Sequence, residues 1–326
     1  MRSARIFERT FIVAASVSAL LALPVTAQEL PKKPITLVVG FAAGGAADMA
    51  ARIIAKKLSE NIGQQVVVDN RAGAGGNIAH LAVSRAEPDG SMILLGSIGP
   101  LAIAPHLTNV GYDPQKDLAP LTMAVNFPNV LVVHAGLGVK TLAEFIALAK
   151  EKPGALDYAS TGAGSASHLA GELFNQRAGV EIVHVPYKGG APALTDLLGE
   201  RIAAYYSTPS TAAPHIESGK LIPLATTGLT RPSFMPDVPT IAESGFPAFN
   251  ATNWYAFVAP GKTPEPILNR WHQELVKALG APEVREELLK HGLTPMPDSR
   301  EELARFIDSE SKTWAQVIKE RKITAD

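Results

Sequence analysis

The chain has 326 residues, of which 46% are hydrophobic and 19% are charged, a globular composition with enough length for about two domains. Its formal net charge of −1 argues against a nucleic-acid-binding surface. The sequence contains no cysteine, which excludes structural disulfides, thiolate catalysis and cysteine zinc sites.

The N-terminus has the pattern of an export signal. Arg2, Arg5 and Arg9 precede an apolar run over 11–23, and small residues follow up to Ala27. This order predicts cleavage after Ala27, so residues 1–27 would be removed on export. The alternative is a retained membrane anchor, but the apolar run is short for a membrane span.

The first strongly patterned stretch is an apolar strand over 34–40 that enters a glycine-containing turn over 41–48. A helix over 48–61 follows. Gly44 and Gly45 allow the chain to turn sharply, so that backbone N–H groups at the helix start are aimed at one point. The helix dipole adds partial positive charge there, which predicts an anion site that needs no arginine. The alternative is an ordinary strand-to-helix turn.

The same alternation continues with strands over 66–68 and 92–95 and a helix that ends near 86. Strands that alternate with helices predict a parallel sheet with right-handed crossovers. Ligands of such sheets bind beyond the carboxyl ends of the strands. We therefore expect the loops at 41–48 and 97–100 to lie at one edge of the sheet.

A second block repeats this plan from about residue 129. We expect strands at 130–134, 156–159, 182–185, 202–206 and 221–226. We expect helices at 141–152 and 193–198, and a helix after residue 168 that ends at 177. Glycine-containing loops follow two of these strands, over 160–168 and 186–192. The second block therefore offers its own set of backbone donors.

The chain closes with a strand over 253–259 and helices over 264–279, 282–291 and 299–322, which we expect to pack on the first block. This arrangement makes the second block an insertion. We predict an α/β fold of two lobes, each a mainly parallel sheet flanked by helices, with a hinge of two crossing segments. Lobe 1 would comprise 28–127 plus 254–326 and lobe 2 would comprise 128–253. A cleft between such lobes is a natural ligand site.

Backbone N–H groups and hydroxyls outnumber cations in the loops that we expect to face this cleft. The hydroxyls belong to Ser97, Thr161, Ser165 and Ser207. A small carboxylate accepts several hydrogen bonds at once and suits such donors.

Motifs for catalysis are absent or weak: there is no Gly-x-Ser-x-Gly, His-Glu-x-x-His or Walker loop. The candidates for an acid or a base are His168, Asp48 and Lys188. His168 could instead order its loop or contact the ligand, Asp48 could order the first turn or meet the ligand through water, and Lys188 could face a distal acid group or solvent. We expect no metal and no cofactor.

Five sequence runs together, over 40–52, 70–77, 89–90, 162–172 and 185–196, resemble the substrate-binding receptors of tripartite tricarboxylate transporters, the Bug family. The resemblance covers essentially the whole mature chain. It implies a periplasmic two-lobed protein that closes on one small organic acid and delivers it to membrane transporter subunits. We expect a monomer that binds no nucleic acid.

The resemblance also implies that the loops at 41–48 and 161–168 hold one ligand carboxylate, partly through water, while distal contacts set specificity. The residues expected to bind ligand are Phe41, Ala42, Gly44, Gly45, Ala46, Asp48, Ser97, Thr161, Gly162, Ser165, His168, Tyr187, Lys188, Gly189 and Ser207. The family often has proline before the paired glycines and proline or a hydroxyl after them, where this chain has Ala43 and Ala46. One hydroxyl contact is therefore missing.

Two other functions fit the same cleft. An exported sensor would pass its bound state to a two-component kinase, and an exported enzyme acting on small acids would need a tuned acid and base facing the cleft.

Overall fold

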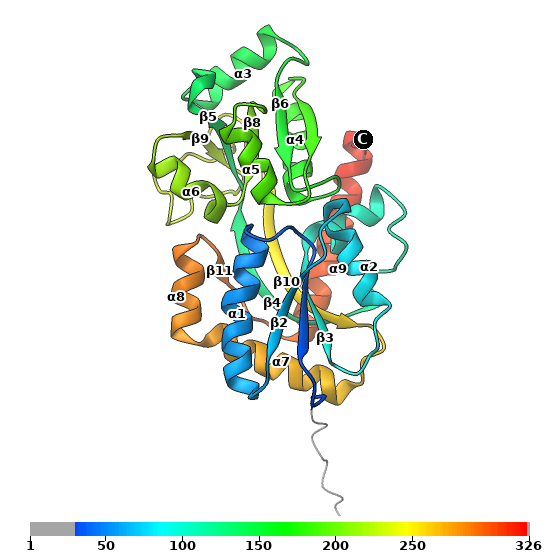
Figure 1. The fold of residues 1–326 in the computed structure, drawn as a ribbon. Helices are drawn as coiled ribbons and strands as arrows, with labels where there is room; N and C mark the ends of the chain where they lie inside the picture. Colours follow the sequence, from blue (N-terminus) through cyan, green and yellow to red (C-terminus); the bar gives the residue numbers. More distant parts are fainter. Residues whose placement is uncertain (1–29, 325–326) are drawn as a thin grey trace, which may run out of the picture.

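The computed structural model describes residues 30–324, so the predicted export signal lies outside the described residues. Within this range, six strands form one sheet in the order β11-β4-β10-β3-β1-β2, and five form a second sheet in the order β7-β6-β8-β5-β9. Figure 1 shows the two sheets in two lobes, with helices around each sheet. The predicted two-lobed α/β fold is confirmed. Both sheets are mixed and not mainly parallel as predicted, because the first contains three antiparallel strand pairings and the second contains two.

Lobe 1 is built on the six-stranded sheet. Its strands and helices are β1 (Ile35–Val39), α1 (Ala46–Ile62), β2 (Val66–Asn70), α2 (Asn77–Ser84), β3 (Met92–Ser97), β4 (Leu118–Pro128), β10 (Thr252–Pro260), α7 (Glu265–Gly280), α8 (Pro282–Lys290), β11 (Thr294–Pro295) and α9 (Arg300–Arg321). Strand β1 lies between β2 and β3 and pairs in parallel with both. Its side chains are almost all buried, which explains the continuous apolar run in the sequence.

Lobe 2 is built on the five-stranded sheet. Its strands and helices are β5 (Val130–His134), α3 (Leu142–Glu151), β6 (Asp157–Ser160), α4 (Ala166–Ala178), β7 (Val183–Pro186), α5 (Gly190–Leu198), β8 (Ala204–Ser207), α6 (Pro209–Glu217) and β9 (Leu221–Thr226). Strands β6, β7 and β8 run parallel, and β5 runs antiparallel to β8 and β9. No helix within residues 30–324 is both long enough and apolar enough to cross a membrane.

The sequence pattern did not predict β4, although it pairs with β10 along that strand's whole length. Its 11 residues include Pro120 and Pro128, which read as strand breakers. Pro120 lies opposite Val258, next to a register shift in the pairing, where the missing N–H is tolerated. Helix α6 was missed for a similar reason, because it contains Pro209 and Pro214.

Helix α9 packs on lobe 1 as expected, but its end reaches lobe 2 (Figure 1). There, the Gln176 side chain of α4 donates a hydrogen bond to the carbonyl of Arg321 at 2.7 Å. Ile318 and Ile323 belong to the same buried apolar cluster as Phe174 of α4. The C-terminal helix is therefore a further contact between the lobes.

The two crossing segments are tied together around one threonine. Thr227 exchanges two hydrogen bonds with Asn129: its Oγ1 accepts from the Asn129 N–H at 2.9 Å, and its own N–H donates to the Asn129 carbonyl at 3.0 Å. The same Oγ1 donates to the carbonyl of Ala251 at 2.8 Å. Because Asn129 precedes β5 and Ala251 precedes β10, Thr227 joins both crossings.

We expect Thr227→Val to lower the free energy of unfolding by about 1–3 kcal/mol, because it leaves a buried N–H and a buried carbonyl without this partner. Urea denaturation measures the change. Thr195→Val is the matched control, since the exposed Thr195 hydroxyl bonds only its own helix at Ala191. Its expected effect is within about 0.5 kcal/mol, and equal losses for the two variants would contradict the hinge role.

Candidate functional site

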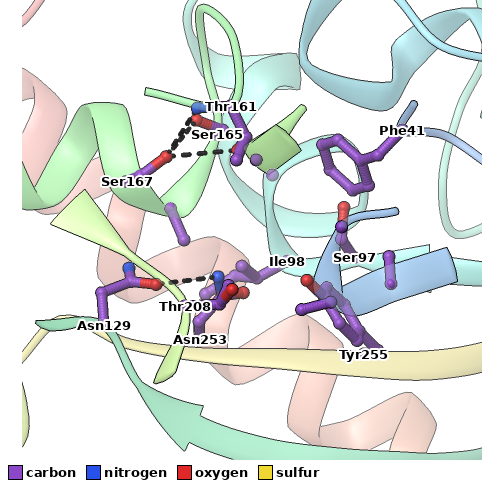
Figure 2. Close-up of a pocket in the computed structure, with 16 residues that line it drawn as sticks. Phe41, Ser97, Ile98, Asn129, Thr161, Ser165, Ser167, Thr208, Asn253 and Tyr255 are labelled. Atoms are coloured by element: carbon purple, nitrogen blue, oxygen red, sulfur yellow. Dashed lines mark hydrogen bonds between the residues drawn. The ribbon is translucent and has the colours of Figure 1, made fainter. Parts of the chain in front are cut away.

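A pocket lies between the lobes, beyond the ends of strands β1 and β3 on one side and β6 and β8 on the other (Figure 2). It encloses about 450 Å³ of space between atoms, and part of this space is open to solvent. The centre of a water molecule can occupy about 20 Å³ of it. The lining residues are Phe41, Gly45, Ala46, Ala47, Ser97, Ile98, Gly99, Asn129, Thr161, Ser165, Ala166, Ser167, Gly190, Thr208, Asn253 and Tyr255.

The wall from lobe 1 is the turn between β1 and α1. Gly44 has φ +83°, a conformation that favours glycine. Gly45 is the N-cap of α1 and provides no side chain to accept from the first-turn N–H groups. The N–H groups of Ala46 and Ala47, both in the pocket wall, cannot bond within the helix. They therefore remain donors for an acceptor in the pocket.

Asp48 orders this turn from outside the pocket lining. Its carboxylate accepts from the Gly44 N–H at 3.0 Å and forms a salt bridge with Arg52 at 2.8 Å. Burial alone would raise the pKa of Asp48, but the hydrogen bonds from Arg52 and Gly44 outweigh it and hold the pKa below its usual value. The carboxylate is thus ionised and neutralised by Arg52.

The wall from lobe 2 is the loop between β6 and α4, and Ser167 organises it. The Ser167 hydroxyl accepts from the Thr161 N–H at 2.9 Å and lies 3.1 Å from the Ser165 hydroxyl (Figure 2). Ser165 is also the N-cap of α4, accepting from the His168 N–H at 3.3 Å. The helix start thus places hydroxyls and first-turn N–H groups at the pocket.

His168 lies behind this loop and does not line the pocket. Its Nδ1 accepts from the Gly164 N–H at 3.1 Å, and its ring stacks on His184 with centroids 4.0 Å apart. Burial lowers the pKa of His168 to about 4, so the ring is neutral near pH 7. This geometry favours the alternative in which His168 orders the loop.

Of the fifteen residues predicted to bind ligand, six lie together in the pocket wall: Phe41, Gly45, Ala46, Ser97, Thr161 and Ser165. The loops at 41–48 and 161–168 therefore face one cavity. The other nine lie outside the lining: Ala42, Gly44, Asp48, Gly162, His168, Tyr187, Lys188, Gly189 and Ser207.

Four of these nine, Tyr187, Ser207, Lys188 and Ala42, have other partners that explain their positions. The Tyr187 hydroxyl donates to Asp196 at 2.8 Å, and the Ser207 hydroxyl donates to the carbonyl of Thr208 at 3.1 Å. The Lys188 carbonyl accepts from the Ala42 N–H at 3.0 Å, a backbone bond between the lobes. The backbone of Lys188 thus joins the two lobes.

Sequence reasoning missed ten lining residues: Ala47, Ile98, Gly99, Asn129, Ala166, Ser167, Gly190, Thr208, Asn253 and Tyr255. Ala47, Ile98, Ala166, Gly190 and Thr208 are sequence neighbours of residues that were predicted to bind ligand. The Ser165-Ala-Ser167 spacing at a helix start could have indicated Ser167 as a further hydroxyl at the pocket. Asn129 and Asn253 lie on the two crossings, where no motif marks a binding residue.

The pocket wall contains no Asp, Glu, Lys, Arg or His. No group of three residues that could hold a metal ion occurs within residues 30–324. A bound anion would therefore be held by backbone dipoles, hydroxyls and amides. Such neutral donors bind well when they are preorganised and excluded from water.

Close backbone contacts between lobes frame the pocket. Gly75 has φ +61°, and a Cβ there would overlap the carbonyl oxygen of Ala163. A Cβ at Gly99 would lie 2.8 Å from the carbonyl oxygen of Gly164. The observed approach of the lobes thus requires glycine at these positions.

Buried histidines predict a specific pH dependence of stability. Burial lowers the pKa of His80 and of His168 to about 4. Burial and the neighbouring His168 lower the pKa of His184 to about 3. The unfolded chain binds these protons near pH 6.5. The stabilisation is therefore complete above about pH 6.5 and is lost as the pH falls toward about 4.

We expect the free energy of unfolding, measured by urea titration, to fall as the pH decreases across this window. In His168→Asn, the free energy of unfolding should change less steeply with pH. His106→Asn, at an exposed histidine, is the control and should keep the slope. A stability that is constant between pH 7 and pH 4.5 would contradict the account.

Comparison with known proteins places this geometry in a family. Residues 50–323 match the family model described as "Tripartite tricarboxylate transporter family receptor". Protein BugT of Bordetella pertussis is 38% identical over 312 residues, covering 95% of this chain and 94% of that protein. A UPF0065 protein of Pseudomonas sp. strain P51 is 40% identical over 297 residues, covering 91% of this chain and 88% of that protein.

Solved structures agree. Rpa4515 of R. palustris, determined with adipate, superposes with a TM-score of 0.87 at 36% identity, covering 90% of this chain and 99% of that one. MatC of Rhodopseudomonas palustris, with bound malate, has a TM-score of 0.85 at 31% identity, covering 88% and 99%. The chain therefore belongs to the receptor family of tripartite tricarboxylate transporters, a family of solute-binding proteins and not of enzymes.

Proposed function

We propose that this protein is a periplasmic receptor that captures a small carboxylate between its lobes and delivers it to the membrane subunits of a tripartite tricarboxylate-type transporter. The observation that carries the proposal is that α1 and α4, from different lobes, both begin in the wall of one pocket without charged side chains. The adipate and malate in the two solved relatives support the ligand class.

Two helix N-termini suit a carboxylate because each supplies N–H groups and the positive end of a dipole. Asp48 does not oppose such an anion, since Arg52 neutralises it. Hydrogen bonds to a charged group contribute about 1.5–3 kcal/mol each. Several of them, less the cost of association, support micromolar affinity, about −8 kcal/mol.

Export and assembly follow from the same proposal. The predicted signal, with cleavage after Ala27, would deliver the mature chain to the periplasm as a monomer. We assign lobe 1 to 28–127 plus 254–326 and lobe 2 to 128–253, with boundaries one or two residues inside the ends of β4 and β10, where the chain crosses between the lobes. In this scheme the ligand contacts on both lobes favour the closed form, since they are made together only when the lobes meet.

A thermal-shift screen tests the ligand class. A carboxylate at 100 times its Kd should stabilise the protein by about 2.7 kcal/mol, following RT ln(1 + [L]/Kd), and should be recovered unchanged. Neutral sugars are the control and should leave the melting temperature unchanged. Stabilisation by sugars alone, or conversion of the acid to a product, would contradict the proposal.

Gly75→Ala tests closure without changing a pocket residue. The Cβ would overlap Ala163 of the other lobe, so we expect at least tenfold weaker binding of the best carboxylate from that screen, measured by calorimetry. Gly63→Ala is the matched control: Gly63 has a similar φ of +68°, but no atom lies within 4 Å of its added Cβ. Both variants should lose about 1 kcal/mol of stability to backbone strain. Equal affinity in the two variants would contradict closure through this contact.

A further inference from the structure

Two asparagines bring the crossing segments into the pocket. Asn129 lies between β4 and β5, and Asn253 lies in β10. Both line the pocket, with Asn129 fully buried and Asn253 8% exposed. Figure 2 shows them side by side, on a different part of the wall from the cluster of Thr161, Ser165 and Ser167.

The asparagine pair presents an unused donor. The Asn253 Nδ2 donates to the Asn129 Oδ1 at 3.4 Å, while the Asn129 Nδ2 is buried and has no hydrogen-bond partner within the described residues. Exchanging O and N in both amides would leave Asn253 with the free N–H instead. The pair therefore offers an N–H to the pocket in either arrangement, and a buried amide N–H needs an acceptor.

Ser97 gives an independent second donor on the same cavity. Its side chain is 3% exposed, and its Oγ has no hydrogen-bond partner among residues 30–324. Thr208 also lines the pocket, and its hydroxyl lies 2.8 Å from the Thr211 hydroxyl. None of these groups belongs to the two helix starts that we assign to the carboxylate.

We propose that the paired amides of Asn129 and Asn253 form a subsite that binds a second oxygen acceptor of the ligand. This inference rests on the proposed function. The ligand class is then carboxylates that carry a hydroxyl, carbonyl or second carboxyl oxygen away from the first carboxylate. Simple alkanoates are rejected, because they would leave these buried donors unpaired, and sites built to hydrogen-bond a ligand discriminate strongly against analogues that lack the group.

The subsite also connects ligand recognition to the hinge. The backbone of Asn129 is bonded to Thr227 in both directions, and Asn253 lies two residues after Ala251, which bonds the same threonine. A ligand oxygen on the Asn129 amide would therefore contact the segment about which the lobes rotate.

Matched ligand pairs test the subsite on the unmodified protein. The four pairs are propionate and lactate, butanoate and 4-hydroxybutanoate, butanoate and succinate, and hexanoate and adipate, with Kd from calorimetry. We expect the member with the second oxygen to bind at least tenfold more tightly in the best-binding pair. Equal affinities within the pairs would overturn the subsite and leave carboxylate binding intact, whereas no binding by any carboxylate would overturn the proposed function itself.

Asn129→Asp assigns the effect to the amide. The substitution keeps an oxygen to accept from Asn253 and replaces the free NH2 group by a negatively charged oxygen that cannot donate. Because the added charge acts equally on two monoanions, the preference within a pair of equal charge, such as butanoate and 4-hydroxybutanoate, should fall to less than threefold. Asn175→Asp makes the same change at an amide on α4 that bonds the Ile182 carbonyl outside the pocket, and it should keep the full preference. An unchanged preference in Asn129→Asp, or an equal loss for both members of the pair, would contradict the assignment.

Discussion

A carboxylate that leaves water must recover its hydrogen bonds from the protein, and this requirement explains how the structure is arranged. In our proposal, the donors are the open N–H groups at the starts of α1 and α4 and the hydroxyls beside them. Each helix follows a strand through a short loop, over 40–45 before α1 and over 161–165 before α4, so a sheet fixes its position. Because the two starts belong to different lobes, the full set of donors exists only when the lobes meet.

The other features of the cleft serve this arrangement. Arg52 neutralises Asp48, the one acid in the first turn of α1, so the dipole there is not cancelled. His168 is buried and neutral, and it holds the lobe 2 loop in place. Glycines at the contact between lobes allow backbones to approach where a side chain would separate them. These contacts position the donors. The pocket wall itself contains no Asp, Glu, Lys, Arg or His.

Much of this could be predicted from local pattern. The strand–glycine–helix order at 41–48 and 161–168 predicts donors at strand ends, and parallel topology brings those ends to one edge. Other parts needed the tertiary structure. Strand β4 was hidden by its prolines: Pro120 is tolerated next to a register shift in the pairing with β10, and Pro128 is the last residue of the strand. Asn129 and Asn253 are far apart in sequence and meet only because both crossings pass the same point.

The central claim is that both helix starts bind the same carboxylate. The most direct test is an amide NMR titration of the 15N-labelled protein with the best carboxylate from the screen. We predict downfield proton shifts, at one common midpoint, for the amides of Ala46 and Ala47 in lobe 1 and of Ala166 and Ser167 in lobe 2. Shifts confined to one lobe, or at neither helix start, would contradict the account.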